Sequence, residues 1–103
     1  MAKLIGGSFQ ADATPTSIYD HLVAAGVIDE DRRDPMFIMN LTVQNNSGAV
    51  LYLGDSTLDS GTPRVMLILQ DGQSLAEILN GYHVNLRDVF VEGDGTVSVL
   101  GLQ

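Results

Sequence analysis

The sequence has no cysteine, no tryptophan and few basic residues, with only 5 lysines and arginines among its 103 residues. Without cysteine the chain can form neither a disulfide framework nor a zinc site built on thiolates. The 13 acidic side chains outnumber the basic ones and give a net charge of -8 at pH 7. This charge opposes nucleic-acid binding, because contacts with phosphate depend on lysine and arginine. The absence of tryptophan also disfavours a carbohydrate-binding platform.

Long hydrophobic runs are lacking as well. No apolar stretch approaches the roughly 20 residues of a transmembrane helix, and residues 1–7 lack the apolar core of a signal peptide. We therefore expect a soluble protein without an export signal or a membrane partner. A chain of 103 residues is expected to form one domain, and a domain of this size gains useful stability from oligomerisation.

From Met36 to Gln103 the sequence contains short alternating apolar runs that end in Gly, Asn or Asp turns. The alternation in Met36–Gln44 is typical of a half-buried strand. The same pattern predicts strands over residues 50–53, 64–70, 88–92 and 96–102. Two segments, Asn45–Gly48 and Asp71-Gly72, have the composition of hairpin turns, and residues 93–95 join the last two strands.

Residues 73–79 fit two different elements. They could return as a strand, which the preceding hairpin turn favours. They could also form a helix, because Ser74–Glu77 is a capping box and Leu75, Ile78 and Leu79 share a helical face. Five or six short strands with frequent turns predict an all-β fold, namely a small antiparallel β-sandwich or a jelly-roll-like barrel.

Residues 1–35 follow a different pattern, which predicts one short helix. Thr16 or Ser17 can cap this helix, and Gly26 can end it. Because two to three turns are too few for a stable isolated helix, we expect it to dock on its own domain or on a neighbouring subunit. We therefore divide the chain into an N-terminal arm over residues 1–35, with the short helix and an acidic linker, and a β-domain over residues 36–103.

No set of residues has the spacing of a catalytic or metal-binding motif. Residues 55–61 resemble a calcium loop, but Thr57 replaces a carboxylate and no glutamate closes the loop. His21 and His83 lack the spacing of a metal site, and the glycines do not form a phosphate loop. We expect no catalytic residue, no metal and no cofactor. A small hydrolase would need a clustered acid–base pair, which the sequence does not indicate.

Four segments occur in an order that is known from one group of proteins. They are Leu41–Gly54, Asp71–Leu75, Val84–Val91 and Gly95–Gly101. A strand leads through an Asn-Asn-Ser-Gly turn into a second strand that ends in Leu-Gly, and the later segments contain DGQSL, NLRDVFV and VSVLG. This order resembles the small β-sandwich virion accessory proteins of tailed bacteriophages. The resemblance implies a non-enzymatic capsid decoration or cement protein, or the base of a head fibre.

From this resemblance we expect a virion protein on the outer capsid surface, present in the host cytoplasm during assembly. Its partner would be the major capsid protein or another virion protein, and it would form a homo-oligomer, with a trimer favoured. We expect the N-terminal arm to supply contacts with a neighbouring subunit or with the shell. The candidate contact residues are Phe9, Ile18, Tyr19, Leu22, Val23, Arg32 and Arg33. Deleting residues 1–30 should then leave a folded β-domain that no longer binds capsids.

The alternative is a head-fibre, neck or tail-tip adaptor domain that binds a protein or glycan receptor. This alternative predicts an exposed aromatic or polar pocket among the loops Gly54–Pro63 and Gly81–Asn85. Binding to a glycan array would distinguish it from a cement protein.

Overall fold

The computed structural model describes residues 4–28, 37–61, 67–75 and 83–102, which form two sheets and one helix. The first sheet contains β1 (Leu4–Ala11), β3 (Phe37–Asn46), β6 (Ser74–Leu75), β7 (His83–Asn85) and β9 (Gly95–Leu102). The second sheet contains β2 (Thr16–Ser17), β4 (Leu51–Gly54), β5 (Leu67–Leu69) and β8 (Phe90–Glu92). The helix, α1, covers Ile18–Ala24.

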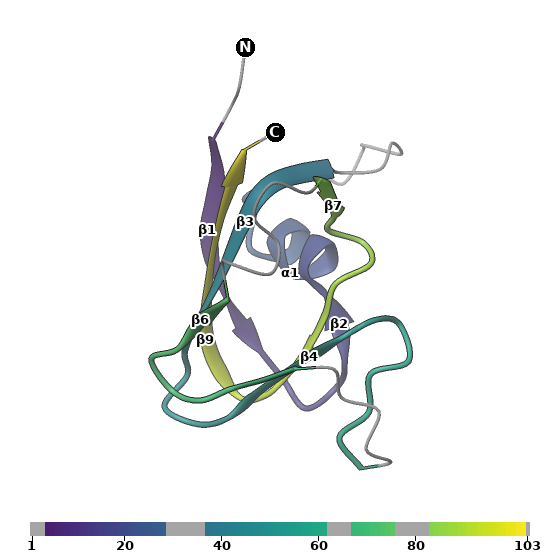
Figure 1. The fold of residues 1–103 in the computed structure, drawn as a ribbon, viewed down its shortest axis with the longest axis vertical. Coiled ribbons are helices and arrows are strands. Elements are labelled where there is room, and N and C mark those ends of the chain that lie inside the picture. The colour runs from purple at the N-terminus through teal and green to yellow at the C-terminus, as the bar shows by residue number, and fades with distance from the viewer. Residues whose placement is uncertain (1–3, 29–36, 62–66, 76–82, 103) are drawn as a thin grey trace.

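The strand order is β1-β9-β3-β6 in the first sheet, with β7 also paired to β3, and β2-β8-β4-β5 in the second. The pairs in both sheets are antiparallel. Figure 1 shows the two sheets on opposite sides of the molecule, with α1 between them at one end. The prediction of a small antiparallel all-β fold with one short N-terminal helix is confirmed.

The core fills the space between the two sheets. In β3, Leu41 and Val43 are buried, whereas Gln44 is exposed. The same alternation buries Val97 and Val99 in β9. The second sheet contributes the buried side chains of Leu51, Leu53, Leu69 and Val91. Since burial of one such side chain stabilises the fold by about 1.5–3 kcal/mol, the predicted alternation identifies the main source of stability.

The two predicted hairpins are absent from the described part of the chain. β3 lies in the first sheet and β4 in the second, so residues 47–50 carry the chain from one sheet to the other. Residues 70–73 do the same between β5 and β6. A turn sequence specifies that the chain reverses, but the partner of the returning strand depends on how its apolar face is buried.

Asn45 holds these two crossings together. Its side chain is fully buried and donates hydrogen bonds from Nδ2 to the carbonyl oxygens of Ala49, at 2.7 Å, and Leu69, at 2.9 Å. Its Oδ1 accepts bonds from the backbone N–H and the Oγ of Ser47. Its backbone exchanges bonds with residues 72 and 73. Every polar group of this buried residue is therefore paired, as burial requires.

The described part of the expected N-terminal arm lies within the sandwich. β1 pairs with β9 along its whole length, from Leu4 opposite Leu102 to Ala11 opposite Gly95. Phe9 and Ala11 are buried in the common core. The sequence pattern did not predict β1 as a strand, because two glycines interrupt its apolar alternation and glycine is a poor strand former.

The helix forms where the sequence predicts it. Ser17 is the N-cap, and its Oγ accepts a hydrogen bond from the backbone N–H of Asp20 at 3.0 Å. Gly26, with a φ of 77°, follows the end of the helix. Ile18 and Leu22 are fully buried in the core. The helix therefore docks on its own domain, which provides the stability that two turns lack alone.

Several predictions lie wholly or partly outside the described residues, among them the loops Gly54–Pro63 and Gly81–Asn85 of the alternative receptor-binding hypothesis. The linker at residues 29–34 is outside the described residues. Within the predicted strand 64–70 the structure describes β5, and within the ambiguous segment 73–79 it describes the short strand β6. Gln70 and Gln73 are described but lie outside these strands, whereas residues 64–66 and 76–79 belong to the parts of the chain that are not described.

Candidate functional site

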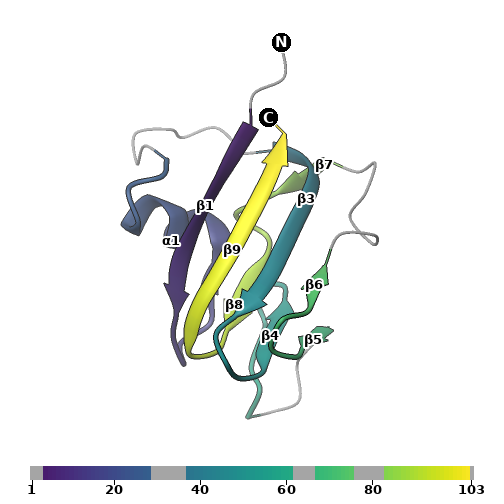
Figure 2. The same cartoon turned by 90° about the vertical axis from the view of Figure 1, so that its left-hand side faces the viewer.

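The outer face of the first sheet is the most distinctive surface of the molecule. We use the name outer face for the side chains of β1, β9 and β3 that point away from the core. These are Leu4, Gly6, Ser8, Gln10, Thr42, Gln44, Asn46, Thr96, Ser98, Leu100 and Leu102. Figure 2 shows the three strands side by side at the front of the molecule.

The strand register arranges these side chains in rows across the sheet. Ser8 lies opposite Ser98, which lies opposite Gln44, and Gln10 lies opposite Thr96 in the next row. Hydrogen bonds connect neighbouring strands at this polar end: Gln10 Nε2 donates to Thr96 Oγ1 at 2.8 Å, and the hydroxyls of Ser8 and Ser98 are 3.0 Å apart.

The other end of the outer face is apolar. Leu4 is 66% exposed and Leu100 is 51% exposed. Gly6 lies beside Leu100, and a Cβ atom at Gly6 would stand only 2.8 Å from Leu100 Cδ1. Glycine therefore makes room for the leucine to lie against the strand. The result is a face with a hydrogen-bonded polar end and an exposed leucine end.

The outer face carries no charge. β1, β3 and β9 contain no Asp, Glu, Lys, Arg or His at all, although the chain has a net charge of -8. Several described carboxylates lie in loops, where Asp55, Asp59 and Asp71 accept hydrogen bonds from nearby backbone N–H groups. The sequence thus keeps charged side chains away from one broad sheet surface.

The structure places most of the predicted contact residues inside the protein. Phe9, Ile18, Tyr19 and Leu22 are buried in the core, and Val23 packs against it. Tyr19 also lies under Arg87, whose guanidinium carbon is 3.9 Å from the ring centroid. Four of these side chains are therefore buried within their own domain, and Val23 is partly buried. Arg32 and Arg33 lie outside the described residues.

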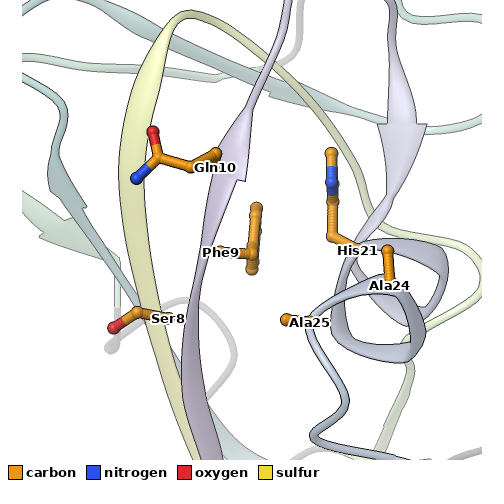
Figure 3. A pocket seen from close by; sticks show the side chains of 6 residues that line it. All are labelled: Ser8, Phe9, Gln10, His21, Ala24 and Ala25. Atoms are coloured by element: carbon orange, nitrogen blue, oxygen red, sulfur yellow. The ribbon is translucent and has the colours of Figure 1, made fainter.

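A groove lies between β1 and α1, next to the outer face. It has a volume of about 380 Å³ and is lined by Ser8, Phe9, Gln10, His21, Ala24 and Ala25. The rings of Phe9 and His21 are stacked, with centroids 4.5 Å apart and planes 6° apart. In Figure 3 these rings face each other between strand and helix, whereas Ser8 and Gln10 point to the other side of β1.

His21 is buried in this stack. Burial lowers the pKa of its imidazole below the ordinary value of 6.5, and the nearby carboxylates of Asp12 and Asp20 oppose that effect. The imidazole is therefore neutral at pH 7. Its Nε2 atom is buried and has no hydrogen-bond partner among the described residues. The sequence alone did not indicate this environment, because Phe9 and His21 come from different elements. The side chain of His83 is not described.

The loop that resembles a calcium site is held by its own hydrogen bonds. Asp55 Oδ1 accepts bonds from the backbone N–H and the Oγ1 of Thr57. Ser60 donates bonds from its backbone N–H and its Oγ to the buried carboxylate of Glu92. Within the described ranges no three His, Asp or Glu side chains cluster in a way that would hold a metal ion.

No described helix is long and apolar enough to cross a membrane. Comparisons with protein-family models, with curated proteins and with solved structures find no match to this chain. The outer face and the groove beside it are therefore the two features on which an interpretation of function can be built.

Proposed function

We propose that this chain is a non-enzymatic structural protein of a tailed-phage virion, a capsid decoration protein that docks on the head shell through its outer face. The observation that carries the proposal is the lack of any charged residue in β1, β3 and β9 of a chain with a net charge of -8. The resemblance of residues 41–101 to phage virion accessory proteins supplies the class of partner.

An uncharged face suits protein docking for a physical reason. Charged side chains lose their hydration when an interface forms, and this cost is often not recovered. The centres of protein interfaces are accordingly depleted in charge. Leu4 and Leu100 offer apolar area to a partner, while the hydroxyls and amides at the polar end can exchange hydrogen bonds with it.

The size of the outer face favours docking by several copies at once. β1 and β9 have 8 residues each and β3 has 10. At about 3.3 Å per residue and about 4.8 Å between strands, the three strands cover roughly 400 Å². A stable interface of standard size buries about 800 Å² on each partner. One copy would therefore bind weakly. A homotrimer would present three such faces to the shell and gain affinity through multivalency, so we include a trimer in the proposal.

A pair of matched substitutions tests the proposal. Leu100 on the outer face and Ile68 on the second sheet are 51% and 54% exposed. We expect Leu100→Arg to weaken binding to heads that lack this protein by more than tenfold, because the interface would have to bury a charge. Ile68→Arg adds the same charge elsewhere and should bind like the unmodified protein. Binding is measured by co-sedimentation with the heads.

Either of two results would contradict the proposal. Undiminished binding of Leu100→Arg would show that the outer face is not the docking surface. Failure of the unmodified protein to bind heads, together with binding to tail or neck components, would assign it to another part of the virion. Circular dichroism of both variants controls for folding.

A further inference from the structure

The groove between β1 and α1 lies along a free edge of the first sheet. In the strand order, β1 is the terminal strand, and among the described residues it pairs only with β9. The backbone groups on the other side of such a strand can bond to an additional strand. Natural edge strands are commonly protected by charges, prolines or bulges. β1 has no charged residue and no proline, and its register with β9 is unbroken.

The groove offers space for one side chain next to this edge. Val27, after the helix, packs against Gly7 of β1, since a Cβ atom at Gly7 would lie 2.7 Å from Val27 Cγ2. Ala24 and Ala25 form the helical wall and are exposed. Because alanine side chains are short, α1 leaves room for the side chain of an added strand. The stacked rings of Phe9 and His21 form the inner wall (Figure 3).

His21 supplies a specific polar contact in this groove. Its side chain is 8% exposed, and Nε2 has no partner within the described part of the chain. Burying a polar atom without a partner is unfavourable, so a ligand that bonds to it gains affinity. A hydroxyl group can donate or accept a hydrogen bond and would satisfy Nε2 in either tautomer. Serine and threonine are the short side chains that carry such a group.

The charges around the groove favour a basic ligand. Asp12 and Asp20 act electrostatically on His21, which places both carboxylates near it. The whole chain adds a net charge of -8. A positively charged segment is attracted by this field.

We propose that the free edge of β1 binds an extended, positively charged segment of a partner protein as an added strand. One serine or threonine of that segment sits between β1 and α1 and bonds to Nε2 of His21. Backbone hydrogen bonds to β1 provide affinity, and the side-chain position provides specificity, as in other cases of strand addition. This site adjoins the outer face at Ser8 and Gln10 of β1, but it does not depend on the proposed function.

A labelled peptide tests the inference directly. The probe has alternating valine and threonine in its centre and two lysines at each end, and fluorescence anisotropy measures its binding to the intact chain. We expect at least tenfold tighter binding than for a twin peptide with glutamates at the ends. We expect Ala24→Trp, which fills the groove, to weaken binding at least tenfold. Gln44→Trp introduces the same side chain on the outer face and should have no effect.

The role of His21 is tested by combining protein and peptide variants. His21→Phe preserves an aromatic ring on Phe9 but removes Nε2, and we expect it to weaken binding about tenfold. Replacing the peptide threonines with alanine should weaken binding to the unmodified protein by a similar factor. The same replacement should have no further effect on binding to His21→Phe, because the two partners of one hydrogen bond are coupled.

Amide hydrogen exchange locates the bound peptide. We expect increased protection within Leu4–Ala11 when the basic peptide binds. The inference is overturned if the peptide fails to bind, if Ala24→Trp binds it undiminished, or if the acidic twin binds equally well. It is also overturned if the chain alone is a dimer whose β1 amides are already protected, since a second copy would then occupy the edge.

Discussion

Asn45 shows how one buried polar residue can fix the connections of a sandwich. Its Nδ2 donates to Ala49 in the first crossing and to Leu69 at the end of β5, and its Oδ1 accepts bonds from Ser47. An aspartate or leucine of similar size could not reproduce these bonds, because neither can donate to two carbonyl groups. The adjacent Asn46 provides a comparison, since it is exposed and bonds to Ser98 on the outer face.

We predict that Asn45→Ala lowers the free energy of unfolding by roughly 2–4 kcal/mol, because several buried groups lose their partners. Asn46→Ala should change it by less than about 0.5 kcal/mol, as is usual for an exposed position. Urea unfolding followed by circular dichroism measures both variants. Equal effects of the two substitutions would show that Asn45 does not hold the crossings.

His21 makes stability depend on pH in a defined direction. Burial lowers the pKa of the folded imidazole below 6.5, so the unfolded chain binds the proton more strongly. The free energy of unfolding should therefore fall as the pH drops below about 6.5, and this loss should be complete below the folded pKa. Asp12 and Asp20 reduce the effect but do not reverse it.

We predict that the fall in the free energy of unfolding below about pH 6.5 disappears in His21→Phe. This variant keeps an aromatic ring stacked against Phe9. His83→Gln is the control, and its stability should fall with pH as it does in the unmodified chain. Urea midpoints measured between pH 7.5 and pH 5 compare the variants with the unmodified chain. If His21→Phe loses stability in acid as steeply as the unmodified chain, His21 is not the group responsible.

At the scale of elements, local patterns predicted which residues form strands and a helix but not how the strands pair. Alternation identified β3, β4, β8 and β9, and capping identified α1. The two predicted hairpins failed because β3 and β4 lie in different sheets, and so do β5 and β6. Pairing partners are set by burial of whole faces, which a turn sequence does not encode. β1 was missed because Gly6 and Gly7 break its apolar pattern.

The pairing of β1 predicts the outcome of a truncation. β1 covers one edge of β9 and contributes Phe9 and Ala11 to the core. We expect a chain without residues 1–11 to lose cooperative urea unfolding, because the loss of a core phenylalanine alone costs about 3–5 kcal/mol and small domains are only about 5–15 kcal/mol stable. Ser8→Ala serves as the control and should unfold like the unmodified chain. If the truncated chain unfolded at an unchanged urea concentration, β1 would not contribute to the stability of the domain.

At the scale of the whole molecule, the candidate site depends on the arrangement of distant segments. The lack of charge in β1, β3 and β9 is visible in the sequence, but their adjacency is not, since residues 4–11 and 95–102 are neighbours only in the folded sheet. The contacts predicted from the sequence were instead Phe9, four apolar residues of the helix, and Arg32 and Arg33. The apolar residues among these fill the core or pack against it, and periodicity alone does not distinguish a core face from an interface.

The absence of cysteine allows a direct test of docking through the outer face, because any introduced thiol is unique. Leu100→Cys places one on the outer face and Ile68→Cys places one on the second sheet, at positions of similar exposure. The rate of maleimide labelling is compared between free protein and protein bound to heads. We predict that binding slows labelling of Leu100→Cys more than tenfold and leaves that of Ile68→Cys unchanged. Protection of Ile68→Cys with free reaction of Leu100→Cys would contradict the account.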